Sequence, residues 1–353
     1  MNGKLIICCN RYLGEPGPWF GPEVTDETVR WVSFDDRPVY YWERIFRRPN
    51  LAMLRTAVQA VWTGRKNGAQ LLFITDAGAA AWCGLVSLIL RSKIPYCAFT
   101  FNYPNPPSGI KRLLMSFVLR RIDEFFVHSS MERALYSTHF RIPIERFRVR
   151  LWGIGKPDMI SEPPLHPRPY ICAIGSNGRD YKTLMQATRL LPHIPVVVVA
   201  LPENLKDTVV PKNVRLLVDA PLRVAMNMLK FSEFTVLPLL SSNTPCGHVT
   251  LVCAMHLQKA VIATDSEGIS DYIKAGHNGI LCKPSSPTEL AAAISKLWND
   301  PDLTARLAAA NEKFGAAYCT EEVARRDLAE LMIRYGLPTN TRREPSDVAC
   351  DRS

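Results

Sequence analysis

No run of apolar residues in this sequence reaches the roughly 18 that a membrane-spanning helix needs. The longest, residues 77–90, is closed by Asp76 and Arg91 and is better suited to a buried helix. The N-terminal residues turn polar too soon for a secretory signal peptide. We therefore expect a cytoplasmic protein without a membrane span.

The sequence also lacks any C-x-x-C pair, although it contains ten cysteines. Several of them, such as Cys8, Cys9 and Cys172, lie inside apolar runs, where a reduced cysteine behaves as a small hydrophobic residue. This pattern argues against a disulfide framework and a zinc site, and it fits a reducing compartment. We expect no metal site.

No internal repeat of solenoid length is present, and 353 residues exceed what one hydrophobic core usually supports, so two domains are expected. The net charge of +10 is concentrated in residues 1–150, with 21 Lys and Arg against 12 Asp and Glu. This surplus suggests an anionic partner, such as a phospholipid surface or a lipid-diphosphate acceptor. The alternative is a basic surface that only aids solubility. The charges are not interleaved with aromatics in a recognisable module, so nucleic acid is not expected.

Apolar runs suited to buried strands alternate with segments of helical periodicity. Strand-like runs lie at residues 4–9, 69–74, 96–101, 124–127, 170–174, 196–201, 214–218, 234–239 and 260–264. Helical segments lie at 50–62, 79–91, 110–122, 179–191, 222–229, 249–257, 288–298, 303–314 and 321–335. Residues 31–34 and 39–41 fit either short strands or irregular structure. The alternation predicts an α/β fold with doubly wound parallel sheets.

Four prolines between residues 163 and 169 indicate a linker between the two domains. We expect an N-terminal domain at residues 1–160 and a C-terminal domain at 161–336. The last helix is a candidate to pack back on the N-terminal domain. The polar tail at 337–353 has no periodicity and is expected to be disordered.

The segment from Ile110 to Ile122 is basic and amphipathic. It carries Lys111, Arg112, Arg120 and Arg121 beside Leu, Met, Phe and Val residues. A helix of this kind can lie on an anionic membrane surface. It can equally pack on its own sheet, and the sequence leaves both readings open.

Residues 237–283 form the most informative stretch. An apolar strand is followed by a turn-prone loop, a helix from about Val249, and a second strand at residues 260–264. The loop lies at the carboxyl end of the strand, and the free N–H groups of the helix point into it. Helix amides and the helix dipole both favour negative charge, so we expect an anion such as a phosphate there.

Several segments resemble one family in order and spacing. Gly175-Ser-Asn-Gly-Arg-Asp-Tyr-Lys-Thr-Leu184 resembles the phosphate-binding turn that opens the C-terminal domain of family-four GT-B glycosyltransferases, and Pro245 to Met255 resembles their signature segment. His128-Ser-Ser-Met-Glu132 and Trp152-Gly-Ile154 fit the end of their N-terminal domain. The resemblance implies two Rossmann-like domains facing a central cleft. It also implies retaining, metal-independent transfer of a sugar from a nucleoside-diphosphate donor of UDP or GDP type.

The resemblance and the local pattern together select candidate site residues. Donor-binding candidates are Gly175, Ser176, Arg179, Lys182, Asp219, Cys246, Gly247, His248, Val249, Thr250 and Cys253. Catalytic candidates are His128, Asn243, Thr244 and His248. Arg179 is a candidate phosphate ligand or a surface ion-pair partner, and Lys182 assists or is simply exposed. His248 faces the sugar or diphosphate, or caps its own helix. His128 serves the acceptor, or is an ordinary buried histidine.

One departure concerns the two glutamates that the family usually carries in the signature segment. Thr244 and Cys253 occupy the corresponding places, and the gap between them is one residue longer. A thiol forms weak hydrogen bonds and would replace a ribose-binding carboxylate poorly. We expect a hexosyltransferase that acts on a lipid-linked or polysaccharide acceptor in envelope or exopolysaccharide synthesis, at the inner face of the cytoplasmic membrane. The alternatives are a catalytically inactive binding or scaffold subunit and a sugar-nucleotide epimerase.

Overall fold

The computed structural model describes residues 4–10, 24, 27–45, 50–103, 105–155, 163–206, 208–243 and 245–340. The chain divides into two compact units. The first comprises Met1–Thr100, Phe117–Phe125 and Arg325–Ser353, and the second comprises Phe101–Ser116 and Phe126–Ala324. The boundary expected between residues 160 and 161 stays a prediction.

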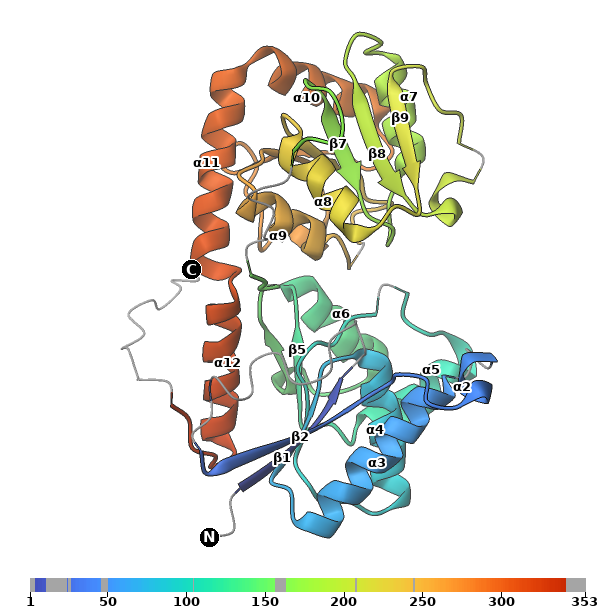
Figure 1. Cartoon of the computed structure of the whole chain (residues 1–353), viewed down its shortest axis with the longest axis vertical. Coiled ribbons are helices and arrows are strands. Elements are labelled where there is room, and N and C mark those ends of the chain that lie inside the picture. Colours follow the sequence, from blue (N-terminus) through green and yellow to red (C-terminus); the bar gives the residue numbers. More distant parts are fainter. Residues whose placement is uncertain are drawn as a thin grey trace. The chain divides into compact units, whose positions relative to one another are not determined.

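Two parallel six-stranded sheets organise the chain (Figure 1). The first has the order β2-β1-β3-β4-β5-β6. Its strands are β1 (Lys4–Asn10), β2 (Val29–Asp35), β3 (Leu71–Ile74), β4 (Tyr96–Ala98), β5 (Glu124–Val127) and β6 (Phe147–Val149). The associated helices are α2 (Tyr41–Ile45), α3 (Leu51–Asn67), α4 (Ala77–Ile89), α5 (Gly109–Leu119), α6 (Ser130–Phe140) and the short η1 (Ile144–Arg146).

The second sheet has the order β12-β11-β10-β7-β8-β9. Its strands are β7 (Ile171–Ile174), β8 (Val196–Ala200), β9 (Val214–Val218), β10 (Thr235–Leu237), β11 (Val261–Thr264) and β12 (Ile280–Cys282). The helices of this half and of the C-terminus are α7 (Tyr181–Arg189), η2 (Pro202–Leu205), α8 (Leu222–Phe231), α9 (His248–His256), η3 (Glu267–Ile269), α10 (Pro287–Asn299), α11 (Pro301–Tyr318) and α12 (Glu321–Arg334).

The central strands are buried on both faces, which explains their continuous apolar sequences. β7 and β8 read ICAI and VVVVA, and all nine residues are buried. One core, which includes Leu251 and Met255 of α9, covers one face of the second sheet. Another, which includes Leu184 of α7 and Ile294 of α10, covers the other. Strands of a parallel sheet that is covered by helices on both faces have such continuous apolar sequences. The predicted α/β class is therefore confirmed.

Several helices that follow the carboxyl ends of strands have a polar N-cap side chain. Asp76, Ser129 and Asp180 accept backbone N–H groups in the first turns of α4, α6 and α7. These N-caps satisfy donors that the helix itself leaves unpaired. They hold the strand-to-helix turns in place where a site can form.

The nine cysteines in the described part of the chain are free and buried. The expectation of hydrophobic cysteines is therefore met for them. The tail expected to be disordered falls mostly outside the described residues.

Candidate functional site

The turn after β7 is shaped around an arginine. Gly175 has a φ of 114°, a left-handed value that disfavours residues with a side chain. A Cβ at this position would lie 2.5 Å from Nη2 of Arg179. The missing side chain of Gly175 therefore makes room for the guanidinium.

Arg179 lies inside the protein, with 6% of its surface exposed. Its Nε donates to the carbonyl oxygen of Ile174 at 3.2 Å, and Nη1 donates to that of Asn177 at 2.7 Å. Nη2 donates to Oγ1 of Thr250 at 2.9 Å. Among the residues that the structure describes, no carboxylate forms an ion pair with this guanidinium. Arg179 is thus a buried cation held by neutral groups, and the surface ion pair considered from the sequence is not formed.

The loop after β10 is fastened to the turn after β7. The N–H of Asp180 donates to Pro238 at 3.0 Å, and the N–H of Leu240 donates to Gly178 at 3.0 Å. Sγ of Cys246, which is 5% exposed, donates to the carbonyl of Asn177 at 2.9 Å. Because β7 and β10 are neighbours in the sheet, the two loops meet at its carboxyl edge.

The N-terminus of α9 opens at this meeting point. Gly247 is the N-cap residue, with a φ of 106°, and has no side chain to cap the helix. His248, Val249 and Thr250 form the first turn. Their amides and the helix dipole make this end of α9 electropositive.

His248 is oriented by a backbone carbonyl. Its ring is 4% exposed, and Nε2 lies 2.7 Å from the oxygen of Gly268. A carbonyl only accepts hydrogen bonds, so Nε2 carries a proton and donates it to Gly268. His248 therefore bonds to the η3 region and does not cap α9 with its side chain.

His128 is the most deeply buried of the predicted catalytic candidates. It is 1% exposed, and Nδ1 donates to the carbonyl of Arg150 at 3.2 Å. Nε2 has no hydrogen-bond partner among the residues that the structure describes. Its ring centroid lies 4.7 Å from that of Trp152 and 6.1 Å from that of His248. Burial, then the positive charge of Arg150, holds the pKa of His128 well below its usual value, so the ring is neutral.

Glu132 was not predicted as a site residue. It is fully buried, and Oε2 accepts the N–H of His128 at 2.7 Å. Asn102 donates from Nδ2 both to Oε1 of Glu132 and, at 3.0 Å, to the carbonyl of Pro245. Burial raises the pKa of the Glu132 carboxyl, while the charge of His248 and the hydrogen bond from Asn102 oppose this rise. The Ser129-x-x-Glu132 spacing, typical of a capping box, was the available sequence signal.

The remaining predicted residues are spread more widely. Lys182 and Asn243 are exposed. Asp219 is also exposed and directly follows β9, which lies two strands away from β7. Ser176 is partly buried, and its carbonyl accepts a hydrogen bond from Asn204 at 2.6 Å. Thr244 lies outside the described residues.

Cys253 belongs to α9, is 4% exposed and packs in the hydrophobic core to which this helix contributes. Burial raises the pKa of its thiol to about 11, so it is a neutral thiol at physiological pH. Its predicted contact with a donor ribose stays a prediction.

No group of three or more His, Cys, Asp or Glu side chains within the described ranges could hold a metal ion. Across the same ranges, every helix is too short or too polar to cross a membrane.

Residues 204–314, which include the loop after β10 and α9, match the family model described as "Glycosyl transferases group 1". The alpha-D-kanosaminyltransferase of Streptomyces kanamyceticus is 32% identical over 111 residues. That alignment spans 31% of this chain and 28% of the relative. The predicted resemblance is confirmed for this segment.

Solved structures match over nearly the whole chain. HepE of Anabaena in complex with UDP-glucose aligns with a TM-score of 0.71 and 16% identity, covering 94% of this chain and 99% of that one. A glycosyltransferase from Rickettsia africae aligns with a TM-score of 0.67 and 13% identity, covering 95% of this chain and 99% of that one. The sucrose-phosphate synthase of Thermosynechococcus elongatus aligns with a TM-score of 0.64 and 16% identity, covering 94% of this chain and 98% of that one. At these identities the likeness shows the fold, which is GT-B.

Proposed function

We propose, for a GT-B chain whose residues 204–314 match glycosyl transferases group 1, that the protein is a retaining glycosyltransferase. It would move a sugar from a nucleoside-diphosphate donor to a lipid-linked or polysaccharide acceptor in envelope or exopolysaccharide synthesis. The HepE structure contains UDP-glucose, so a UDP sugar is the first donor to test and a GDP sugar the second.

The observation that carries this proposal is the position of Arg179. A buried guanidinium without a carboxylate partner lies 2.9 Å from Thr250, in the first turn of α9. A helix N-terminus is itself electropositive, so it disfavours a nearby cation unless an anion is present. Uncompensated buried charge is costly. A diphosphate would satisfy both the guanidinium and the helix amides, and they would stabilise its leaving-group charge during transfer.

The acceptor side is proposed from the basic first half. In α5, Ile110, Leu113, Leu114 and Phe117 are 77%, 58%, 63% and 63% exposed. They follow an i, i+3, i+4, i+7 pattern, which is one face of a helix. Lys111 and the residues around it supply positive charge, and the sequence from 105 to 122 contains no acid. This face would lie on an anionic membrane surface and bring the enzyme to a lipid-linked acceptor.

The test uses purified full-length protein and a panel of UDP and GDP sugars. Binding is measured by the rise in melting temperature, because a ligand that binds the native state stabilises it. Release of nucleoside diphosphate, with and without a lipid-diphosphate acceptor, measures turnover. No shift and no turnover with any donor would contradict the proposal.

The site assignment has a matched pair of variants. Arg179→Gln removes the buried guanidinium, whereas Lys182→Gln removes an exposed cation three residues away. We expect at least a tenfold weaker donor affinity for the first, in line with the loss of a charge-assisted hydrogen bond, and a small change for the second. Circular dichroism confirms that both variants are folded at the assay temperature. Equal donor affinities would refute the assignment of Arg179.

The second candidate is a catalytically inactive GT-B subunit, which the buried thiol of Cys253 favours. This position corresponds to a glutamate in the resemblance, and the side chain here is neutral and packed in a core. Such a protein would bind a nucleotide sugar without turning it over. Hydrolysis of the donor by the purified protein would exclude the inactive subunit. Formation of an epimer from the donor alone, without any acceptor, would indicate a sugar-nucleotide epimerase.

A further inference from the structure

Helix α2 has its apolar side chains outside and its acid inside. Its one buried residue is Glu43, at 4% exposure. Tyr41 and Ile45 in the same helix are 79% and 57% exposed, and Trp42 is 43% exposed. Tyr40, just before the helix, is 50% exposed and stacks on Trp42 with the ring centroids 5.4 Å apart. We call Tyr40, Tyr41, Trp42 and Ile45 the α2 aromatic cluster.

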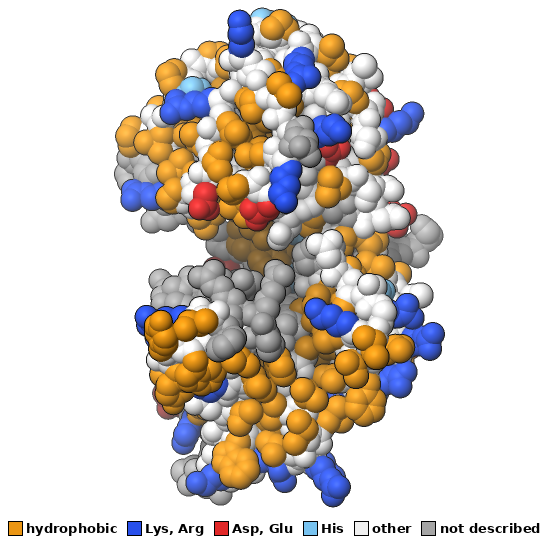
Figure 2. All heavy atoms as spheres, turned by 90° about the vertical axis from the view of Figure 1, so that its right-hand side faces the viewer, with side chains coloured by type: hydrophobic (Ala, Val, Ile, Leu, Met, Phe, Trp, Pro, Cys, Tyr) orange, Lys and Arg blue, Asp and Glu red, His pale blue; other side chains and the backbone are white. Residues whose placement is uncertain are grey.

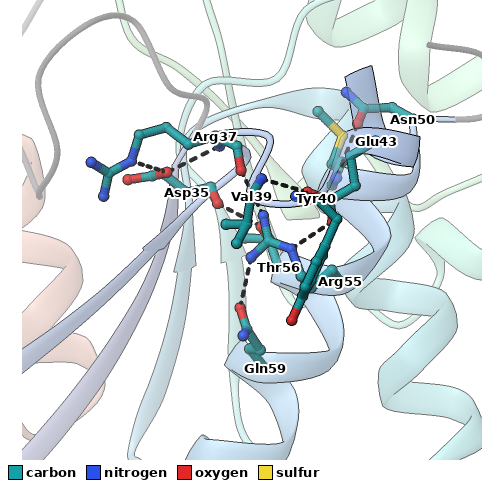
Figure 3. A network of polar contacts seen from close by, with 10 residues as sticks. Asp35, Arg37, Val39, Tyr40, Glu43, Asn50, Arg55, Thr56 and Gln59 are labelled. Carbon is teal, nitrogen blue, oxygen red and sulfur yellow. Dashed lines mark hydrogen bonds and ion pairs between the residues drawn. The ribbon is translucent and has the colours of Figure 1, made fainter. Parts of the chain in front are cut away.

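The buried carboxylate of Glu43 holds α2 with its apolar side chains outward (Figure 3). Oε2 of Glu43 accepts the backbone N–H groups of Val39 at 2.7 Å and Tyr40 at 3.3 Å. Oε1 accepts Nε of Arg55, on α3, at 2.7 Å. Nη2 of Arg55 then donates to the carbonyl of Arg37 at 2.7 Å. The network fastens the segment before α2 to α3 and directs the aromatic side chains outward.

Only one sign of charge remains on the outer side of α2. Glu43 is the only acid in this helix, and it is paired with Arg55 in the interior. Arg44 is exposed beside the cluster. Figure 2 shows hydrophobic side chains gathered with Lys and Arg on the face to which α2 belongs. The surface therefore combines exposed aromatic and aliphatic groups with positive charge.

We propose that the α2 aromatic cluster docks on the surface of a bilayer that contains anionic lipid. Tyr and Trp combine an apolar ring with a polar tip and are enriched where hydrocarbon meets water. Arginine adds attraction to anionic headgroups. A second copy of this chain would bring positive charge against positive charge, so charge complementarity favours the lipid surface. This proposal does not depend on glycosyl transfer, because docking requires no nucleotide sugar.

The experiment measures co-sedimentation of the full chain with vesicles of phosphatidylcholine alone and of phosphatidylcholine with phosphatidylglycerol. The test variant is Tyr41→Ser with Ile45→Ser. The matched control is Tyr318→Ser with Leu222→Ser, which removes two exposed apolar side chains, 47% and 72% exposed, from other helices. We expect binding to the anionic vesicles, about tenfold weaker in the test variant, since burial of each apolar side chain favours the bound state.

A second pair of variants separates the two candidate membrane elements. Arg44→Glu should weaken binding to the anionic vesicles and leave any binding to neutral vesicles unchanged. Leu114→Ser with Phe117→Ser removes the exposed face of α5. If the α5 variant alone lost binding while the α2 variant bound like the unmodified protein, the α2 proposal would be wrong.

Three other outcomes would also overturn the proposal. One is no binding of the unmodified protein to either vesicle. Another is equal binding by the test and control variants. The third is self-association in sedimentation velocity that the Tyr41→Ser, Ile45→Ser change abolishes without any vesicle binding, which would identify a second copy as the occupant. Melting temperatures of all variants within a few degrees of the unmodified protein confirm that each is folded.

Discussion

Nη2 of Arg179 and Oγ1 of Thr250 lie 2.9 Å apart, which joins the turn after β7 to the first turn of α9. The two residues come from loops that the sheet brings together, because β7 and β10 are adjacent strands. The bond fixes a guanidinium at a helix N-terminus before any ligand arrives. A preorganised cation needs little reorganisation when a leaving group develops charge.

Replacing Gly175 by Ala is expected to disturb this arrangement. Gly175 has a φ of 114°, and the new Cβ would lie 2.5 Å from Nη2 of Arg179. We expect the free energy of unfolding to fall by about 2 kcal/mol or more from backbone strain and steric conflict. Donor affinity should fall as well, because the guanidinium must move. Urea unfolding and donor titration measure the two effects.

Gly276→Ala is the matched control for that prediction. Gly276 has a φ of 74°, but beyond its own chain neighbours no atom of the described residues lies within 4 Å of the place that the new methyl group would take. The variant should lose about 1 kcal/mol from strain alone and keep its donor affinity. If both variants bound the donor as tightly as the unmodified protein, the packing of Gly175 against the guanidinium would not contribute to donor binding.

Substitutions at Cys253 test whether this position contacts the donor. The thiol packs in a hydrophobic core and has a pKa of about 11 because of burial. Cys253→Ala should cost about 1 kcal/mol of stability, as small buried truncations do, and leave donor affinity within about twofold. Cys253→Glu should lower the free energy of unfolding by about 3 kcal/mol or more, because a carboxyl would be buried without a designed partner. Tighter donor binding by the glutamate variant would show that the position does face the ligand.

The sequence was informative where signals are local. The turn at Gly175 and the helix that begins near residue 248 follow from turn residues and apolar periodicity, and α9 is within one residue of its predicted bounds. The bond between Arg179 and Thr250 joins positions 71 residues apart. It depends on strand order, which no local pattern encodes. Cys253 was assigned by correspondence with a family position, and its burial became visible only once both cores were built.

Helix α2 shows a second limit of sequence analysis. Its apolar residues face outward and its acid faces inward, so the usual rule that apolar residues mark the buried face misassigns it. The partner that makes this possible, Arg55, belongs to another helix 12 positions away. Glu132 and Asn102 illustrate the same point, since 30 residues separate them in the chain.

The pH dependence of stability should carry a contribution from His128. Its pKa is lowered in the folded protein, mainly by burial, whereas an unfolded histidine titrates near about 6.5. Below that pH the unfolded state binds more protons than the folded state. The contribution is therefore complete above about pH 6.5 and is lost on acidification at up to about 1.4 kcal/mol per pH unit.

Urea unfolding between pH 5 and pH 7.5 measures this contribution. His128→Gln should flatten the dependence below pH 6.5. His277→Gln, which replaces an exposed histidine in the same unit, is the control and should retain the slope. Identical slopes for the unmodified protein and the His128 variant would show that the buried ring has no such effect.

The ion pair between Glu43 and Arg55 should be a strong local contribution to the stability of the first unit. The Glu43 side chain is fully buried, and its carboxylate also accepts the backbone N–H groups of Val39 and Tyr40. Glu43→Ala would leave these donors and the guanidinium without their acceptor. We expect a loss of about 3–5 kcal/mol, the range for breaking a buried pair by removing one partner. Arg37→Ala removes a side chain that is 50% exposed and paired with Asp35, and should cost less than about 1 kcal/mol.

Acid should weaken the same network with a defined sign. Burial of Glu43 raises its pKa, but the hydrogen bonds from Arg55 and from the backbone outweigh this and leave the pKa lowered. The stabilisation is therefore complete above the unfolded value of about 4.3 and is lost as the pH falls through the folded value. Because the carboxylate also fixes the direction of the α2 aromatic cluster, Glu43→Ala should weaken binding to anionic vesicles although no atom of Glu43 would touch them. A variant that lost stability but bound vesicles as before would separate the network from docking.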